Sequence, residues 1–158
     1  MNILLPRKFR LAGFILAFIG IVLGVIRFYF DIKLKIFDVK VFAVYSKYFE
    51  TNYLSIISNH VSEELTALFL ITGLFFICFS KEKDETEILQ ELRIKSFLLT
   101  FYLNTAFILF SFLFIYGFVF INILIINLFS PFIIFIVVFN WLKFRAKQNS
   151  NNNLSISK

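Results

Sequence analysis

His60 is the only histidine in the chain, and with Glu63 and Glu64 it forms a His-x-x-Glu-Glu pattern. On one continuous helix this spacing would place a ring nitrogen and two carboxylates on adjacent faces, and these are groups that bind metal ions. A catalytic zinc site uses three protein ligands, usually with a second histidine. Because the sequence has no second histidine, we interpret the pattern as a water-exposed helix start and predict no metal-binding residues. Metal binding centred on His60 is the alternative.

Cys78 is the only cysteine, and it lies in an apolar run, where a cysteine behaves as a small hydrophobic side chain. With no second cysteine the chain cannot form an internal disulfide. The sequence also lacks a glycine-rich phosphate-binding loop, and neither a Ser-His-Asp set nor a Cys-His pair can be assembled in positions compatible with a membrane. We therefore predict no catalytic residues, no cofactor and no enzymatic activity.

The composition points to a membrane protein. Hydrophobic residues make up 59% of the 158 residues and charged residues 16%, against about 45–50% and about 25% in ordinary globular chains. A soluble domain of this size could not bury that much apolar surface, so the lipid bilayer is the expected partner. The net charge of +6 could suggest nucleic acid, but a basic face with interleaved aromatic residues is missing, and we predict no nucleic-acid binding.

Residues 81–95 divide the apolar chain into two halves, because nine of these fifteen residues are ionisable. A charge at the bilayer centre costs about 2.5–3.5 kcal/mol on the most lenient scale, so this segment must lie in water. Two interpretations remain open: the segment only extends the third helix, or it contacts a membrane or cytosolic protein. The candidate contact residues are Glu82, Asp84, Glu85, Glu87, Glu91 and Arg93.

The apolar runs predict four membrane-crossing helices, at about 9–30, 62–80, 96–117 and 121–143, since a crossing needs about 20 residues. Residues 97–142 contain no Asp, Glu, Lys, Arg or His and are too long for one helix, so they hold two helices and a tight turn near 117–122. Pro131 then falls inside the fourth helix and should kink it. The predicted fold class is an all-α membrane protein, with residues 1–145 forming one small antiparallel bundle of four transmembrane helices.

The longest predicted loop covers residues 31–61. Two runs of alternating polarity, 32–36 and 37–41, predict short strands of a small β-hairpin. Leu54, Ile57 and Val61 follow helical spacing and predict a short amphipathic helix after the strands. The polar tail at 146–158 is low in complexity and is predicted to be disordered.

The distribution of basic residues predicts the orientation. Four crossings place the N-terminus, residues 81–95 and the C-terminus on one side, with residues 31–61 on the other. The 16 basic residues divide eleven to five in favour of the first side. Because Lys and Arg accumulate on the cytoplasmic side of membrane proteins, we predict that both termini are cytoplasmic and that the 31–61 loop is extracytoplasmic.

Small residues recur along one face of the first helix, at spacings of four, three and four: Gly13, Ala17, Gly20 and Gly24. Small side chains let two helices approach closely in a membrane, where no hydrophobic force draws helices together. We predict that this face packs against another helix of the same chain. A face for a homo-oligomer is the alternative.

Polar side chains within the predicted spans form a second pattern, with the candidate intramembrane contacts Thr100, Asn104, Asn122 and Asn127. Amide and hydroxyl groups in hydrocarbon seek hydrogen-bond partners on neighbouring helices, so the first interpretation is contact between helices. The alternative is a polar path in a small channel or transporter subunit. Against it, no Asp, Glu, Lys, Arg or His lies deep in any span, whereas ion and proton pathways normally contain one.

Three stretches resemble a group of small four-span bacterial inner-membrane proteins with no known activity. They are residues 79–85, Leu92-Arg93 with Ser96, and residues 38–43 in the long loop. The resemblance covers most of residues 1–145 and implies a multi-pass protein of the bacterial cytoplasmic (inner) membrane, while it implies no ligand. The resemblance leaves the function open. The missing catalytic groups and the single exposed charged segment at residues 81–95 favour a non-enzymatic integral membrane protein that acts through protein–protein contacts.

Overall fold

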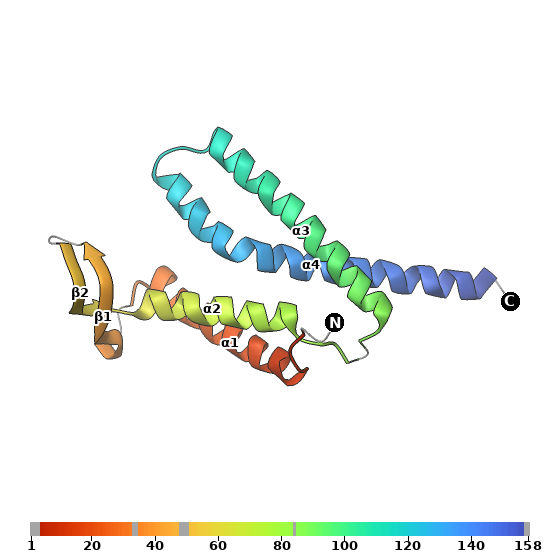
Figure 1. Ribbon diagram of the computed structural model, residues 1–158, viewed down its shortest axis with the longest axis horizontal. Coiled ribbons are helices and arrows are strands. Elements are labelled where there is room, and N and C mark those ends of the chain that lie inside the picture. The colour runs from red at the N-terminus through yellow and green to blue at the C-terminus, as the bar shows by residue number, and fades with distance from the viewer. Residues whose placement is uncertain (1–3, 33–34, 48–50, 84, 157–158) are drawn as a thin grey trace. The chain divides into compact units, whose positions relative to one another are not determined.

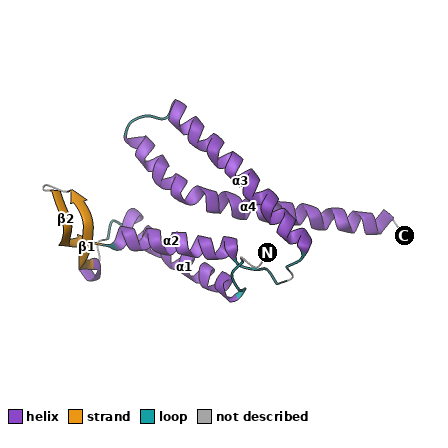
Figure 2. Ribbon diagram, in the orientation of Figure 1, coloured by secondary structure: helices purple, strands orange, loops and turns teal. Residues whose placement is uncertain are grey.

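The computed structural model describes residues 4–32, 35–47, 51–83 and 85–156, and it is mostly helical with one small hairpin (Figures 1 and 2). The chain divides into two compact units, one made of Met1–Phe14 with Leu74–Lys158 and the other of Ile15–Gly73. The elements are, in chain order, α1 (Lys8–Gly24), the π-helical η1 (Val25–Tyr29), the 3₁₀ turn η2 (Lys35–Phe37), β1 (Asp38–Lys47), β2 (Thr51–His60), α2 (Ser62–Phe79), α3 (Glu87–Phe114) and α4 (Phe118–Ile156).

Four helices in the described part of the chain are long and apolar enough to cross a membrane. Their spans are Lys8–Tyr29, Ser62–Phe79, Glu87–Phe114 and Phe118–Asn149. Few side chains in these spans are buried inside the structure, so most of their apolar surface is left for contact with lipid or another chain. The predicted set of four long apolar helices with a small hairpin is confirmed.

The Ile15–Gly73 unit pairs part of α1 with the first turns of α2. Gly20 and Gly24 lie against α2, opposite Leu70 and Thr66 respectively. At the end of η1, Arg27 donates to Glu63 on α2 at 2.7 Å and to Asp31 at 2.6 Å. This ion pair therefore joins the helices at the end where the hairpin begins.

The hairpin differs from its predicted form. β1 and β2 pair antiparallel, from Asp38 opposite His60 toward the turn, so the predicted amphipathic helix over Leu54–Val61 is wrong. Of the predicted strand at 32–36, residues 33–34 lie outside the described residues, and Lys35 and Ile36 belong to the 3₁₀ turn η2 instead. Three apolar residues at helical spacing are weak evidence for a helix, and here cross-strand pairing decides the conformation. Leu54 has a positive φ of 46°, which a helix would exclude.

The other unit is built on the antiparallel pair of α3 and α4. α3 begins at Glu87, where the Thr86 side chain accepts from Leu89 N, nine residues before the predicted start at 96. The connection to α4 contains Gly117 with a φ of +75°, a conformation that favours glycine. α4 begins at Phe118 and continues to Ile156, whereas the sequence predicted a helix end near 143 and a disordered tail.

The core of this unit lies where α2, α3 and α4 meet. Its buried residues are Cys78, Phe135 and Phe139, with Phe79, Leu89, Leu92, Phe132 and Ile136 packed around them. Ser96 and Ser111 are fully buried on α3 and donate to the carbonyls of Leu92 and Phe107. Both hydroxyls therefore find a hydrogen-bond acceptor within α3. Because the two side chains are short, another helix can pack closely against this face.

The N-terminal segment is tied to the chain after α2 by a parallel β-bridge. Leu5 N donates to Phe79 O at 2.9 Å, and Lys81 N donates to Leu5 O at 3.0 Å. The backbone groups that follow the end of α2 thus find partners in a segment more than 70 residues earlier in the sequence.

Candidate functional site

Five charged side chains gather at one end of the unit formed by Met1–Phe14 and Leu74–Lys158. We call them the charged junction: Arg10, Glu82, Glu85, Arg93 and Lys143. They come from α1, the segment after α2, α3 and α4. Buried charges are stable only when they are paired and hydrogen-bonded. The junction meets this condition through contacts between segments far apart in the sequence.

Arg93 lies at the centre of the junction, with a side chain that is 12% exposed. Its guanidinium donates to Cys78 O at 2.7 Å and to both carboxylate oxygens of Glu85 at 3.3 Å. It also lies 4.8 Å from the centre of the Phe139 ring, within range of a cation–π interaction. Arg93 therefore joins the last turn of α2, the loop after it and α4.

Glu82 joins two other segments. Its side chain is 9% exposed and accepts from Arg10 at 2.9 Å and from Lys143. Burial opposes ionisation of this carboxyl, but the hydrogen bond from Lys143 and the charges of Arg10 and Lys143 outweigh it and hold its pKa below the ordinary value. Glu82 is therefore an ionised link between α1 and α4 at neutral pH.

This geometry predicts an acid-sensitive contribution of Glu82 to stability. Because its pKa in the folded protein is lower than its ordinary value of 4.5, the contribution is complete above that ordinary value and is lost as the pH falls through the folded pKa. The free energy of unfolding of the purified protein in micelles should thus fall more steeply below about pH 4.5 in the wild type than in Glu82→Gln. Parallel curves for the two proteins would contradict this expectation.

Three of the six predicted contact residues belong to the charged junction. Glu82, Glu85 and Arg93 are used within the protein, and Asp84 lies outside the described residues. Glu87 and Glu91 are exposed on the first turns of α3. Arg10 and Lys143 were missed by sequence reasoning because nothing local in a sequence shows which distant cation neutralises a carboxylate.

The predicted intramembrane polar residues fall into separate groups. Asn104 on α3 and Asn127 on α4 are brought together, with Asn127 Nδ2 donating to Asn104 Oδ1 at 3.2 Å. Ser130 also donates to Asn104 Oδ1, and its hydroxyl lies 3.3 Å from Asn127 O, the carbonyl that Pro131 leaves without its helical N–H partner. Thr100 is buried without joining this cluster, and Asn122 is exposed.

Asn104→Leu should weaken the α3–α4 pair, because it removes the acceptor shared by Asn127 and Ser130. Hydrogen bonds between helices in membranes contribute about 0.6–2 kcal/mol, and we expect a loss of that order in the free energy of unfolding in mixed micelles. Asn122→Leu, at an exposed amide, is the matched control and should change it little. Equal losses of the free energy of unfolding in the two variants would contradict a role of the Asn104, Asn127 and Ser130 cluster in holding α3 against α4.

The small-residue face of α1 is used within the chain at two positions. A Cβ atom at Gly20 would lie 2.8 Å from Leu70 Cγ and 2.9 Å from Leu70 N, whereas one at Gly24 would lie 3.3 Å from Thr66 Cγ2. Gly13 and Ala17 are buried as well. Of these two glycines, Gly20 therefore lies closer to α2, where both the side chain and the backbone of Leu70 would meet a new Cβ.

His60 forms a pair with Asp38 at the base of the hairpin, with Nδ1 and Oδ1 2.6 Å apart. Glu63 bonds Arg27, and Glu64 accepts from Asn59, so the two carboxylates of the His-x-x-Glu-Glu pattern have other partners. Among the residues that the structure describes, no group of three or more His, Cys, Asp or Glu side chains is placed to hold a metal ion. These contacts instead join the start of α2 to the end of β2, and β2 to β1.

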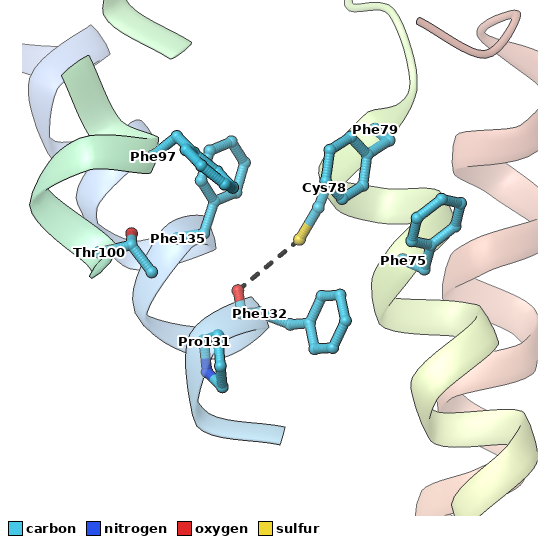
Figure 3. A pocket seen from close by; sticks show the side chains of 8 residues that line it. All are labelled: Phe75, Cys78, Phe79, Phe97, Thr100, Pro131, Phe132 and Phe135. Carbon is cyan, nitrogen blue, oxygen red and sulfur yellow. Dashed lines mark hydrogen bonds between the residues drawn. The ribbon is translucent and has the colours of Figure 1, made fainter. Parts of the chain in front are cut away.

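A cavity of about 320 Å³ lies between α2, α3 and α4 (Figure 3). Aromatic rings form most of its wall, and its lining residues are Phe75, Cys78, Phe79, Phe97, Thr100, Pro131, Phe132 and Phe135. The Cys78 thiol points toward Phe132 O, 3.7 Å away. Such a wall offers apolar contact and almost no polar recognition, which suits a hydrocarbon ligand rather than an ion or a polar solute.

Comparison of the chain with protein-family models, with curated proteins and with solved structures found no match.

Proposed function

We propose that the protein is a multi-pass protein of the bacterial inner membrane that acts through contacts with other proteins and has no enzymatic activity of its own. The observation that carries the proposal is the division of charge around α3. Glu82, Glu85 and Arg93 are bound internally, while Glu87 and Glu91 are exposed to water. The exposed pair lies beside Ile88, which is 67% exposed.

Ile88 is thus exposed beside two carboxylates, whereas Glu82, Glu85 and Arg93 of the same segment form ion pairs within the chain. In the proposed topology it lies in the cytoplasm, beyond the hydrocarbon, so lipid does not cover it. Apolar side chains with a polar rim are typical of protein interfaces. We therefore propose Glu87, Ile88 and Glu91 as the contact surface, and a partner segment that presents an apolar residue beside basic ones.

The proposed membrane topology is tested by cysteine labelling in intact cells, with Cys78 replaced by Ser. Ser58→Cys on the hairpin and Lys83→Cys in the loop after α2 both occupy exposed positions. An impermeant thiol reagent should modify Ser58→Cys from outside, and Lys83→Cys only after the membrane is opened. The reverse pattern would invert the topology, and modification of both from outside would contradict four crossings.

The contact surface is tested by crosslinking and affinity purification from native membranes. Glu87→Gln/Glu91→Gln should lose proteins that copurify with the wild type. Lys147→Gln, at an exposed α4 position, is the control and should retain them. An unchanged set of copurifying proteins in the double variant would refute the contact role while leaving the membrane topology intact.

A further inference from the structure

A second, smaller cavity lies beside the charged junction. Its volume is about 50 Å³, whereas the cavity in Figure 3 has a volume of about 320 Å³. Polar and charged side chains form part of the wall of the small cavity, namely Arg10, Ser80, Glu82, Arg93 and Asn140. All of these residues belong to the unit of Met1–Phe14 and Leu74–Lys158, so the cavity is formed within one compact unit.

Arg93 has one hydrogen-bond donor that the described part of the chain leaves unused. Its two terminal nitrogens donate to Cys78 O, to Ser80 O and to the Glu85 carboxylate. Its Nε is buried, however, and has no hydrogen-bond partner among the described residues. A buried N–H group without an acceptor loses its hydration without compensation. The Arg93 Nε–H therefore needs an acceptor that these side chains do not supply.

Glu82 offers the complementary acceptor in the same wall. Its carboxylate accepts from Arg10 and from Lys143, while an ionised carboxylate has about four acceptor sites. Because the Glu82 side chain is only 9% exposed, bulk solvent reaches little of it. The wall of the cavity thus combines an unused donor on Arg93 with spare acceptor sites on Glu82.

The size and the charges of the cavity select water as its occupant. A water molecule takes up about 30 Å³ in the liquid, so the cavity has room for roughly one or two. The Glu82 carboxylate in the wall repels an anion, and the guanidinium groups of Arg10 and Arg93 repel a metal cation. An apolar molecule would leave the Arg93 Nε–H without an acceptor. A small neutral molecule that both accepts and donates hydrogen bonds satisfies the whole wall.

We infer that this cavity binds ordered water, which accepts from the Arg93 Nε–H and donates to the Glu82 carboxylate. The water joins the two ion-pair groups of the charged junction through hydrogen bonds to their side chains. A buried water held in this way is part of the structure rather than of the solvent. The inference goes beyond the proposed partner contact and does not depend on it, because the residues of that contact surface do not line the cavity.

The test is NMR of the full, isotope-labelled chain in micelles, which observes the Nε–H groups of its arginines and their nuclear Overhauser cross-peaks with water. We expect the Arg93 Nε–H to show a cross-peak with the sign that marks a long-lived water contact. Arg27 is the matched control. Its side chain is 14% exposed, against 12% for Arg93, but its Nε donates to Glu63 Oε1 at 3.1 Å. The Arg27 Nε–H should therefore lack this cross-peak.

Two results in the wild-type chain would overturn the inference. Absence of the cross-peak at Arg93 would mean that the cavity is dry, and equal cross-peaks at Arg93 and Arg27 would mean exchange with bulk solvent only. Ser80→Ala tests for relay through the Ser80 hydroxyl, which lines the same cavity and donates to Phe76 O. The Arg93 cross-peak should persist in this variant. Its loss would show that the hydroxyl proton carried the signal, and would equally contradict the bound water.

Discussion

Gly20→Ala is expected to lower the free energy of unfolding by about 2 kcal/mol, within the range of about 1–3 kcal/mol for overpacking a well-packed contact. The new Cβ would lie 2.8 Å from Leu70 Cγ and 2.9 Å from Leu70 N. The leucine side chain can rotate, but the backbone nitrogen can move only with α2. The two helices must therefore separate, and this loss exceeds the gain of about 1 kcal/mol that alanine brings to a helix.

Gly24→Ala is the matched control for this prediction. At that position the nearest atom to the new Cβ is the Thr66 methyl carbon at 3.3 Å, and a side chain can give way by a few tenths of an ångström. We expect a change below about 1 kcal/mol. The measurement is unfolding of the protein by SDS in mixed micelles, followed by circular dichroism. Equal effects of the two substitutions would show that α1 and α2 are not held together at Gly20.

Arg93→Gln should have the largest effect of any single change at the charged junction. It leaves Glu85, 11% exposed, without its cation, and it removes the donor that Cys78 O receives at the end of α2. Breaking a buried ion pair by removing one partner costs about 3–5 kcal/mol. We expect a loss of this size in the same SDS titration. Arg145→Gln, which removes the contact of an exposed arginine with Trp141 at 4.4 Å, should cost about 1 kcal/mol or less.

A double-mutant cycle separates the ion pair from the other contacts of Arg93. Adding Glu85→Gln to Arg93→Gln neutralises the unpaired carboxylate, so the double variant should be more stable than Arg93→Gln alone. Groups in direct contact show interaction energies of about 0.5–3 kcal/mol. Simple addition of the two single losses would mean that Arg93 acts through Cys78 O and Phe139 without help from Glu85.

The helices could be predicted from the sequence because Asp, Glu, Lys, Arg and His are absent from long stretches. The physical cause that we infer is the high free-energy cost of placing a charged side chain in hydrocarbon. The close approach at Gly20 follows from the spacing of small residues, which placed Gly20 and Gly24 on one face. The sequence could not identify Leu70 and Thr66 as the facing residues, because any of the other helices could have supplied the surface.

Two other features could not be predicted, for different reasons. The helical spacing of Leu54, Ile57 and Val61 competes with pairing to β1, and pairing between strands depends on contacts outside the segment. The charged junction depends on three-dimensional proximity: Glu82 lies 72 residues from Arg10 and 61 from Lys143 (82 − 10 and 143 − 82). The mixed charge of residues 81–95 predicted exposure to water, whereas three of the six predicted contact residues, Glu82, Glu85 and Arg93, form ion pairs within the chain.

The bridge between Leu5 and the residues after α2 imposes an order on biogenesis. Lys81 leaves the ribosome 76 residues after Leu5 (81 − 5), an interval of about 4–15 s at about 5–20 residues per second. By then the first two hydrophobic segments have been synthesised, so the backbone groups of Leu5 have no bridge partner until residues 79–81 follow. The bridge therefore cannot close until both α1 and α2 have been synthesised.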